Sequence, residues 1–231
     1  MNKNKRLLKS GSRLSHLAAM VEPSYRTIWD CCCDHGLLGM SLLRDQCADE
    51  VIFVDVVEDI LASLTTRLES SFPLDQYRWQ VRCEDINNTV VPAADSQLFI
   101  IAGVGPHQTI EFINNLCVSA PETGFDLLIC SVHGSYSVRE VLIKKGYGLK
   151  NEQIIFENNR FYEAIYVSKS ADKAIVDTGS QMWHWPDVVH QDYWHRIVGH
   201  YRQKAKADPL HFQPIIERYE VLLNAIQNTH N

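Results

Sequence analysis

Short apolar runs alternate with amphipathic stretches over most of this chain, and this alternation limits what it can fold into. Five runs are rich in β-branched and aromatic residues and lack interior proline, which predicts buried strands at residues 27–32, 51–55, 79–83, 98–102 and 125–130. Apolar residues at helical spacing predict helices at residues 37–44, 58–69, 106–116 and 136–145. Strands that alternate with helices pair in parallel, so we expect an α/β, Rossmann-like sheet.

The two ends of this pattern add further elements. Leu14, Leu17, Ala18 and Val21 predict a helix before the first strand, with Ser10 or Ser12 as its cap. After residue 147 two longer strands are expected at residues 148–156 and 161–168, separated by the turn-like segment 157–160. Five parallel strands followed by a β-hairpin are the layout of a class I methyltransferase sheet. An NAD-binding Rossmann domain would continue with another crossover helix.

The remainder of the chain predicts a small C-terminal helical element. Residues 169–180 are polar and are interpreted as a linker, and residues 181–231 as a helical hairpin, with helices at 187–205 and 215–226. We therefore expect a domain over residues 1–168, then the linker, then the hairpin.

Composition bounds the class of protein. The chain has 231 residues, of which 45% are hydrophobic, so it can bury a core. No apolar run approaches the roughly 20 residues of a membrane span, and the basic N-terminus lacks the apolar core of a signal peptide. A cytoplasmic protein that does not contact a membrane is expected. The net charge of −6 argues against a surface covered with phosphate-binding groups. Two basic patches remain, one formed by Lys3, Lys5, Arg6, Lys9 and Arg13 and one at residues 139–150; each either binds nucleic acid or is an ordinary solvated face.

The cysteines and histidines do not predict a metal site. Cys31, Cys32 and Cys33 are adjacent, which does not suit a disulfide framework, and no pair of cysteines has the C-x-x-C spacing of zinc sites. The histidines between His184 and His200 recur at intervals of five and six, which do not stack on one helical face. No metal is expected.

Ligands of such a sheet bind beyond the carboxyl ends of its strands, so the loops there hold the candidate residues. The loop after the first strand contributes Asp30, Cys32, Asp34, His35 and Gly36, where backbone can approach a cofactor beside a helix N-terminus. The loop after the second begins with an acid that is placed to bind ribose hydroxyls; its alternative role is to cap the next helix. That loop contributes Asp55 and Val56.

The next two loops supply the remaining candidates. Glu84 and Asp85 follow the third strand and can accept from an adenine amino group while Ile86 packs on the ring; a simple turn is the alternative. After the fourth strand, Ala102, Gly103 and Gly105 form a narrow floor on which a planar base can be presented, or a tight turn without a ligand.

With these loops in place, the chain resembles the bacterial tRNA adenine-22 N1-methyltransferase family from about residue 12 to residue 168. The Asp-x-x-x-Asp-His pattern of Asp30, Asp34 and His35 is the most specific feature, because ordinary methyltransferases have glycines there. The other matching positions are Ser12-Arg13-Leu14, Val56-Val57, Arg82 to Asp85, Gly103-Val104-Gly105, Arg139, Gly146, Arg160, Tyr162 and Glu163.

The resemblance implies S-adenosylmethionine as cofactor, with Arg13 added to its binding residues, and an adenine of tRNA as substrate, bound through the basic N-terminal and C-terminal helices. Adenine N1 carries its own lone pair, so the site has only to hold the base and accept from its amino group. The candidates for this role are Gly103, Gly105, His107, His133 and Tyr162. A structural role is the alternative for each histidine.

Three positions depart from the family pattern. Cys32 replaces a glycine, Gly105-Pro106 replaces a Gly-Gly pair, and Ser131-Val132-His133 replaces Gln-Pro-Asn. These changes leave two alternatives open: a methyltransferase that acts on another RNA or on a small molecule, and a catalytically silent protein that binds S-adenosylmethionine.

Overall fold

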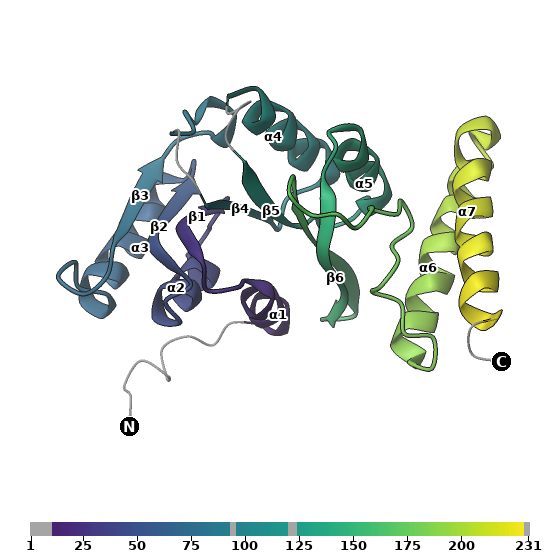
Figure 1. Ribbon diagram of the computed structural model, residues 1–231, viewed down its shortest axis with the longest axis horizontal. Coiled ribbons are helices and arrows are strands. Elements are labelled where there is room, and N and C mark those ends of the chain that lie inside the picture. Colours follow the sequence, from purple (N-terminus) through teal and green to yellow (C-terminus); the bar gives the residue numbers. More distant parts are fainter. Residues whose placement is uncertain (1–10, 93–95, 120–123, 229–231) are drawn as a thin grey trace. The chain divides into compact units, whose positions relative to one another are not determined.

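The structure is a computed structural model that describes residues 11–92, 96–119 and 124–228 (Figure 1). It consists of two compact units, Met1–Ile175 and Val176–Asn231. The predicted basic residues Lys3, Lys5, Arg6 and Lys9, and the cap candidate Ser10, lie outside the described residues.

The first unit is built on a seven-stranded sheet with the order β3-β2-β1-β4-β5-β7-β6. The first five strands of this order pair in parallel, and β7 runs antiparallel to both β5 and β6. The predicted fold class, five parallel strands and a terminal β-hairpin, is confirmed. The strands are β1 Tyr25–Cys31, β2 Ala48–Asp55, β3 Trp79–Cys83, β4 Gln97–Ala102, β5 Phe125–Cys130, β6 Gly148–Glu157 and β7 Arg160–Ser168.

Helices cover both faces of the sheet. One buried cluster joins α1, α2 and α3 to one face, and a second joins α4 and α5 to the other, where Trp29 stacks on Phe99 at 5.2 Å between ring centroids. The helices are α1 Ser12–Met20, α2 Leu37–Arg44, α3 Glu58–Ser71, α4 Pro106–Ser119 and α5 Ser135–Lys144, with a short 3-10 helix η2 Ile86–Asn88. Among the described residues, no helix is long and apolar enough to cross a membrane.

The structure corrects two expectations from the sequence: the buried strand at residues 79–83 and the cap at Ser12. β3 is not a buried strand: it lies at the sheet edge, and Gln80 and Cys83 are exposed. Ser12 does not cap α1, because it is the first helical residue and Gly11 is the N-cap. A side chain far along the sequence replaces the cap, since the Glu157 carboxylate accepts from the Arg13 backbone N–H at 3.0 Å.

The β-hairpin closes with a two-residue turn. Asn158 and Asn159 have φ values of 50° and 59°. Left-handed backbone at both central positions defines the type I′ turn, and asparagine is among the residues that tolerate it best. The turn fixes the register that places Phe156 opposite Phe161, with ring centroids 4.6 Å apart.

A buried ion network ties the hairpin to α5. The Arg139 guanidinium lies 2.6 Å from Glu152 on β6 and 2.8 Å from Glu163 on β7, and all three side chains are fully buried. The two carboxylates raise the pKa of Arg139 against the opposing effect of burial. One buried cation therefore pairs with carboxylates on two strands.

The second unit is a pair of helices. α6 Val188–Ala205 begins at Asp187, whose carboxylate accepts from the Val189 N–H at 2.8 Å, and α7 Pro209–Asn228 follows after three residues. Trp194 donates to the Tyr219 carbonyl at 3.0 Å, which joins the two helices. α7 begins six residues earlier than expected, because Pro209 fits the first turn of a helix and Asp208 accepts from the His211 N–H.

We predict that Arg139→Met lowers the free energy of unfolding by about 3–5 kcal/mol, because it leaves two buried carboxylates without a cation. Chemical denaturation at pH 7 measures the loss. A variant that also carries Glu152→Gln and Glu163→Gln is expected to recover most of it. A triple variant no more stable than Arg139→Met would contradict this explanation.

Candidate functional site

The candidate site lies at the carboxyl ends of the parallel strands. β1 pairs with β2 on one side and with β4 on the other, so the order in which successive strands are added to the sheet reverses at β1. Two cavities of about 350 and 190 Å³ open at this reversal, and Cys32 lines both. Their joint size suits a small organic ligand.

The loop after β1 has an unusual backbone. Cys32, Asp34 and Gly36 have φ values of 55°, 49° and 67°. Gly36 is required by space as well, because a Cβ there would lie 2.5 Å from the Leu64 side chain. The left-handed turns bring the loop across the strand ends, and the Cys33 N–H donates to the Val54 carbonyl at 3.1 Å. Gly36 then serves as the N-cap of α2.

Asp30 is a buried carboxylate at the end of β1. Its Oδ2 accepts from the Gly39 N–H at 2.9 Å, within the first turn of α2. Burial raises the pKa of Asp30 to about 7, and the nearby Asp55 adds to this effect while the hydrogen bond opposes it. A carboxyl poised between its two charge states therefore lines the larger cavity.

Asp55 connects the loops after β1 and β2. Its Oδ2 accepts from the Asp34 N–H at 2.9 Å, and its Oδ1 accepts from Val56 and Val57 at 2.8 and 3.2 Å. The carboxylate lines the smaller cavity, as its ligand-binding role requires. It does not cap α3, whose N-cap is Val57 and which has no side-chain cap hydrogen bond; Asp55 holds the loop before the helix instead.

The smaller cavity is lined by the candidates from the second and third loops. Ile86 is buried at its wall, and Val56 is 65% exposed at its rim. Asp85 accepts from the Asn87 N–H at 2.9 Å and so caps η2, and Glu84 accepts from the Thr89 hydroxyl. Glu84 and Asp85 therefore form the turn after β3 and also line the smaller cavity.

Several lining residues were not among the sequence candidates. Gln108 and Phe112 lie one turn apart on α4 and line the smaller cavity, and Leu37 and Leu38 at the start of α2 line the larger. Helical spacing places Gln108 and Phe112 on one face of α4, which is the signal that could have found them. Asn87 carries no such signal, because η2 was not predicted.

The loops after β4 and β5 are fitted to each other. The Val104 carbonyl accepts from the Val132 N–H at 3.0 Å and from the Ser131 hydroxyl at 3.3 Å. Gly134 has φ +70°, and a Cβ there would lie 2.8 Å from the Pro106 ring. Two of the three departures from the family pattern thus pack against each other, with Gly134 leaving the room that Pro106 needs.

Arg13 reaches the larger cavity from α1. Its guanidinium carbon lies 4.9 Å from the centre of the Tyr162 ring. Both Nη atoms lie 3.9 Å from the position that a Cβ on Gly103 would take. Among the described residues, the buried Nε atom has no hydrogen-bond partner. A half-buried cation that faces a cavity in this way is suited to an anionic ligand group.

The structure brings most of the candidates together. Eleven more of the cofactor candidates line the two cavities alongside Arg13, and Gly36 alone does not. Of the residues expected to hold the substrate base, Gly103 lines the larger cavity, and the other four line neither of these two cavities. Tyr162 contacts Arg13, which lines the larger cavity. His107 and His133 are exposed. Within the described ranges, no group of three or more histidine, cysteine or acidic side chains could hold a metal ion, and all seven cysteines are free.

We predict that Cys32→Gly is tolerated, with the free energy of unfolding changed by less than about 1 kcal/mol, because the relief of left-handed strain offsets the added freedom of the unfolded chain. The matched control is Cys33→Gly at the neighbouring buried position, which we expect to lose more. Thermal and chemical unfolding of both variants test this. A larger loss at Cys32 than at Cys33 would contradict it.

We predict that Asp30→Asn stabilises the unliganded protein at pH 8. An unfolded aspartate titrates near 3.8 and folded Asp30 near 7, so the free energy of unfolding falls as the pH rises from about 4 to about 7. Asparagine removes this dependence and should add roughly 1–3 kcal/mol at pH 8. Denaturation at a series of pH values measures it, with exposed Asp34→Asn as control. Equal pH dependence in Asp30→Asn and the unaltered protein would refute the assignment.

Several solved structures with similar folds are methyltransferases. TrmK of M. capricolum, solved with S-adenosylhomocysteine, is 16% identical, with a TM-score of 0.73 over 93% of this chain and 98% of that one. The B. subtilis tRNA methyltransferase TrmK, which acts at N1 of adenine 22, is also 16% identical, with a TM-score of 0.69 over 97% and 100%. The magnesium protoporphyrin IX methyltransferase of Synechocystis aligns over 69% of this chain, with a TM-score of 0.54 and 14% identity.

At these identities the likenesses establish the fold, and the first two belong to the family that the sequence resembles. No curated protein matches the chain. The model of a methyltransferase domain matches residues 10–165, which hold both cavities and all of the sheet except the end of β7. The chain therefore belongs to the methyltransferase domain family.

Proposed function

We propose that this chain is a methyltransferase that uses S-adenosylmethionine to methylate N1 of an adenine in tRNA. The observation that carries the proposal is the pair of cavities at the strand reversal, bounded by the Asp55 carboxylate at one end and by the Arg13 guanidinium at the other. The similar folds of tRNA methyltransferases support the choice of substrate. A cytoplasmic location accompanies the proposal.

The residues present fit the cofactor along its length. The adenine ring would lie between Val56 and Ile86 in the smaller cavity, with the ribose hydroxyls at Asp55. Cys32, at the junction of the cavities, lets the ligand pass from one to the other. The Arg13 guanidinium would bind the carboxylate of the methionine part through its Nη atoms, which lie beside Gly103 at the larger cavity.

The bound cofactor supplies an electrophilic methyl group on a sulfonium, and the chain supplies alignment. Adenine N1 attacks with its own lone pair, so no covalent nucleophile and no general base is required before the bond forms. Holding two reactants in line is worth at most about 7–11 kcal/mol. Gly103, whose φ of 90° excludes most side chains, leaves space for the base at the cavity mouth. Tyr162 lies beside it, under Arg13. Gly105, His107 and His133 remain candidates.

Asp30 adds an electrostatic contribution. Its ionised form, in a buried position beside the larger cavity, favours the cationic groups of the cofactor. Because the pKa of Asp30 is about 7, affinity should fall as the pH drops from 8 to 6. The charge that destabilises the empty protein at pH 8 is the one that assists binding.

The tRNA would be held in part by basic residues of α6 and the turn that follows it. Arg196 pairs with Asp192 at 2.9 Å and Arg202 with Glu220 at 2.8 Å, and these exposed pairs are weak enough to exchange for phosphates. Lys204 lies 5.2 Å from the Phe212 ring, and Lys206 follows α6.

A second candidate is a methyltransferase for another RNA or for a small molecule. The loop after β5 favours it, since Ser131-Val132-His133 replaces the family's Gln-Pro-Asn and its Ser131 hydroxyl donates to the His133 carbonyl at 2.7 Å. The close fit of Pro106 to Gly134 argues for a rebuilt loop, against a silent protein with a decayed site.

Calorimetric titration with S-adenosylmethionine, followed by tritium transfer to bulk tRNA, tests the proposal. We expect one site and label at N1 of adenine. Binding without transfer to tRNA would favour the second candidate or a silent binding protein, and no binding would remove the proposal.

Asp55→Ala should weaken S-adenosylmethionine binding by about 1–3 kcal/mol, because two ribose hydroxyls lose a charged acceptor. Asp55→Asn is the control for loop geometry, since its side-chain oxygen can still accept from the Val56 N–H. An unchanged dissociation constant in Asp55→Ala would place the cofactor elsewhere.

Lys204→Gln with Lys206→Gln should weaken tRNA binding and reduce the log-log salt slope by about 0.7–0.9 for each phosphate that the protein no longer binds, with cofactor binding unchanged. Binding measured between about 50 and 300 mM salt tests this, and Lys173→Gln in the other unit is a matched charge control. If affinity and slope match those of the unaltered protein, these lysines do not contact tRNA.

A further inference from the structure

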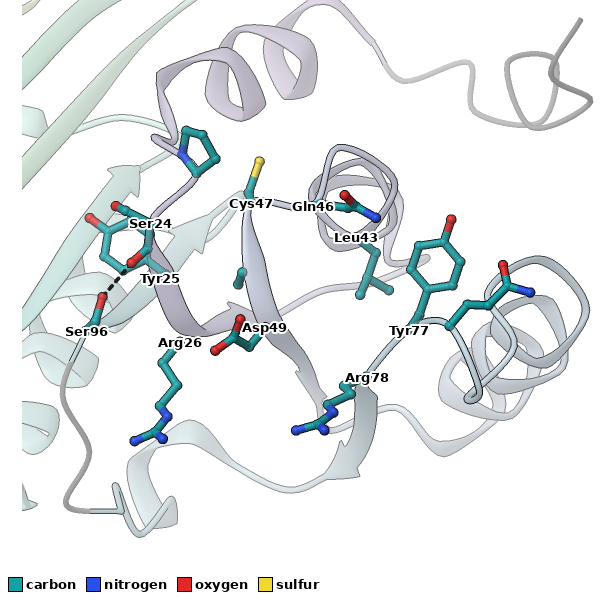
Figure 2. A pocket seen from close by; sticks show the side chains of 13 residues that line it. Ser24, Tyr25, Arg26, Leu43, Gln46, Cys47, Asp49, Tyr77, Arg78 and Ser96 are labelled. Atoms are coloured by element: carbon teal, nitrogen blue, oxygen red, sulfur yellow. Dashed lines mark hydrogen bonds between the residues drawn. The ribbon is translucent and has the colours of Figure 1, made fainter.

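A larger cavity lies at the opposite end of the strands, where β1, β2 and β3 begin (Figure 2). We call this end of the sheet the amino edge and the end that holds the candidate site the carboxyl edge. It is open to solvent and has a volume of about 840 Å³, which exceeds that of either cavity at the carboxyl edge. Its lining includes Arg26, Gln46, Asp49, Tyr77, Arg78 and Ser96. The methyl-transfer chemistry proposed above uses none of these residues.

Two arginines dominate the charge of this cavity. Arg26 lies on β1 and Arg78 directly precedes β3, with β2 between them. The pairing of Tyr25 with Ala48 and of Thr27 with Glu50 sets Arg26 beside Asp49. Even so, among the described residues neither guanidinium forms an ion pair or side-chain hydrogen bond, and Figure 2 shows both directed away from the other side chains drawn there. The cavity thus holds two cations and one carboxylate in a chain with a net charge of −6.

Two non-glycine residues with left-handed backbone lie in the cavity wall. Gln46 and Ser96 have φ values of 53° and 58°. At Gln46 this conformation ends α2, since the Gln46 N–H donates to the Leu43 carbonyl at 3.1 Å and the Cys47 N–H donates to the Leu42 carbonyl at 3.0 Å. Ser96 is held by its hydroxyl, which donates to the Ser24 carbonyl at 2.8 Å. Of the other four such residues, Cys32 and Asp34 belong to the candidate cofactor loop and two form the hairpin turn.

An aromatic ring completes the cavity. Tyr77 is half-buried, and its ring packs edge-on against Phe72 with centroids 5.1 Å apart. This contact holds one side of the ring and leaves the phenol in the cavity lining. A planar ring, two arginine forks and the amide of Gln46 are the groups that recognise a nucleotide: arginine binds phosphate through paired N–H donors, and an aromatic face stacks on a base.

We propose that this amino-edge cavity is a second ligand site, which binds a phosphate-bearing nucleotide. Arg26 and Arg78 bind the phosphate, and Tyr77 contacts the base. The site is independent of the cofactor crevice, because the two open at opposite ends of the same strands.

The test uses the full chain and calorimetric titration with 5′-AMP, with adenosine as the uncharged comparison. We expect one AMP site that persists in Asp55→Ala, and no binding of adenosine at the same concentrations. Arg26→Gln and Arg78→Gln should each weaken AMP binding about tenfold or more. Asp49→Asn should tighten it about two- to fivefold, because it removes the carboxylate that repels phosphate. Lys144→Gln on α5 makes the same charge change as the arginine variants and should have no effect.

The combination of outcomes decides the proposal. Tighter binding in Asp49→Asn together with weaker binding in both arginine variants, at unchanged melting temperatures, supports it. AMP binding lost in Asp55→Ala and kept in the arginine variants would place AMP in the cofactor crevice and overturn it, as would equal affinity in all variants. A ten-nucleotide single-stranded RNA identifies the source of the phosphate: binding through the same arginines more tightly than AMP assigns an RNA chain, and weaker binding assigns a free nucleotide.

Discussion

The pairing of β1 with β2 on one side and with β4 on the other is the constraint on which the rest of this structure depends. The strand order therefore reverses at the centre of a parallel sheet, and the carboxyl ends of β1 and β4 become the walls of one crevice. Asp30 and Asp55 end two of these strands. Their closeness follows from the pairing, and so does the electrostatic coupling that helps to raise the pKa of Asp30.

The two acids affect the stability of the empty site in opposite ways. Burial of the charged Asp30 carboxylate lowers the free energy of unfolding at high pH, whereas Asp55 stabilises two loops by accepting from their backbone N–H groups. A cationic ligand beside Asp30 would offset the cost of its buried charge. This exchange of stability for binding is common where buried polar groups face a cavity.

Departures from a family pattern have to be judged in three dimensions. Pro106 and the altered loop after β5 are far apart in the sequence, since Ser131 lies 25 positions after Pro106. In the structure the proline ring occupies the space beside Gly134, and Val104 accepts two hydrogen bonds from the second loop. Cys32 takes up the left-handed backbone that glycine would adopt more easily. The site is therefore altered in a coherent way.

The sequence by itself determined the order and type of the main elements, because strands and helices have periodicities of two and 3.6 that apolar residues display locally. It also placed Asp30, Asp55 and the glycines at strand ends, where ligands of such sheets bind. Only the tertiary structure decided what depends on distant contacts: the cap that Glu157 gives α1, the exposure of edge strand β3, the orphan Nε of Arg13, and the meeting of Arg26 with Asp49 across neighbouring strands. These features arise from residues far apart along the chain, and no local pattern records such encounters.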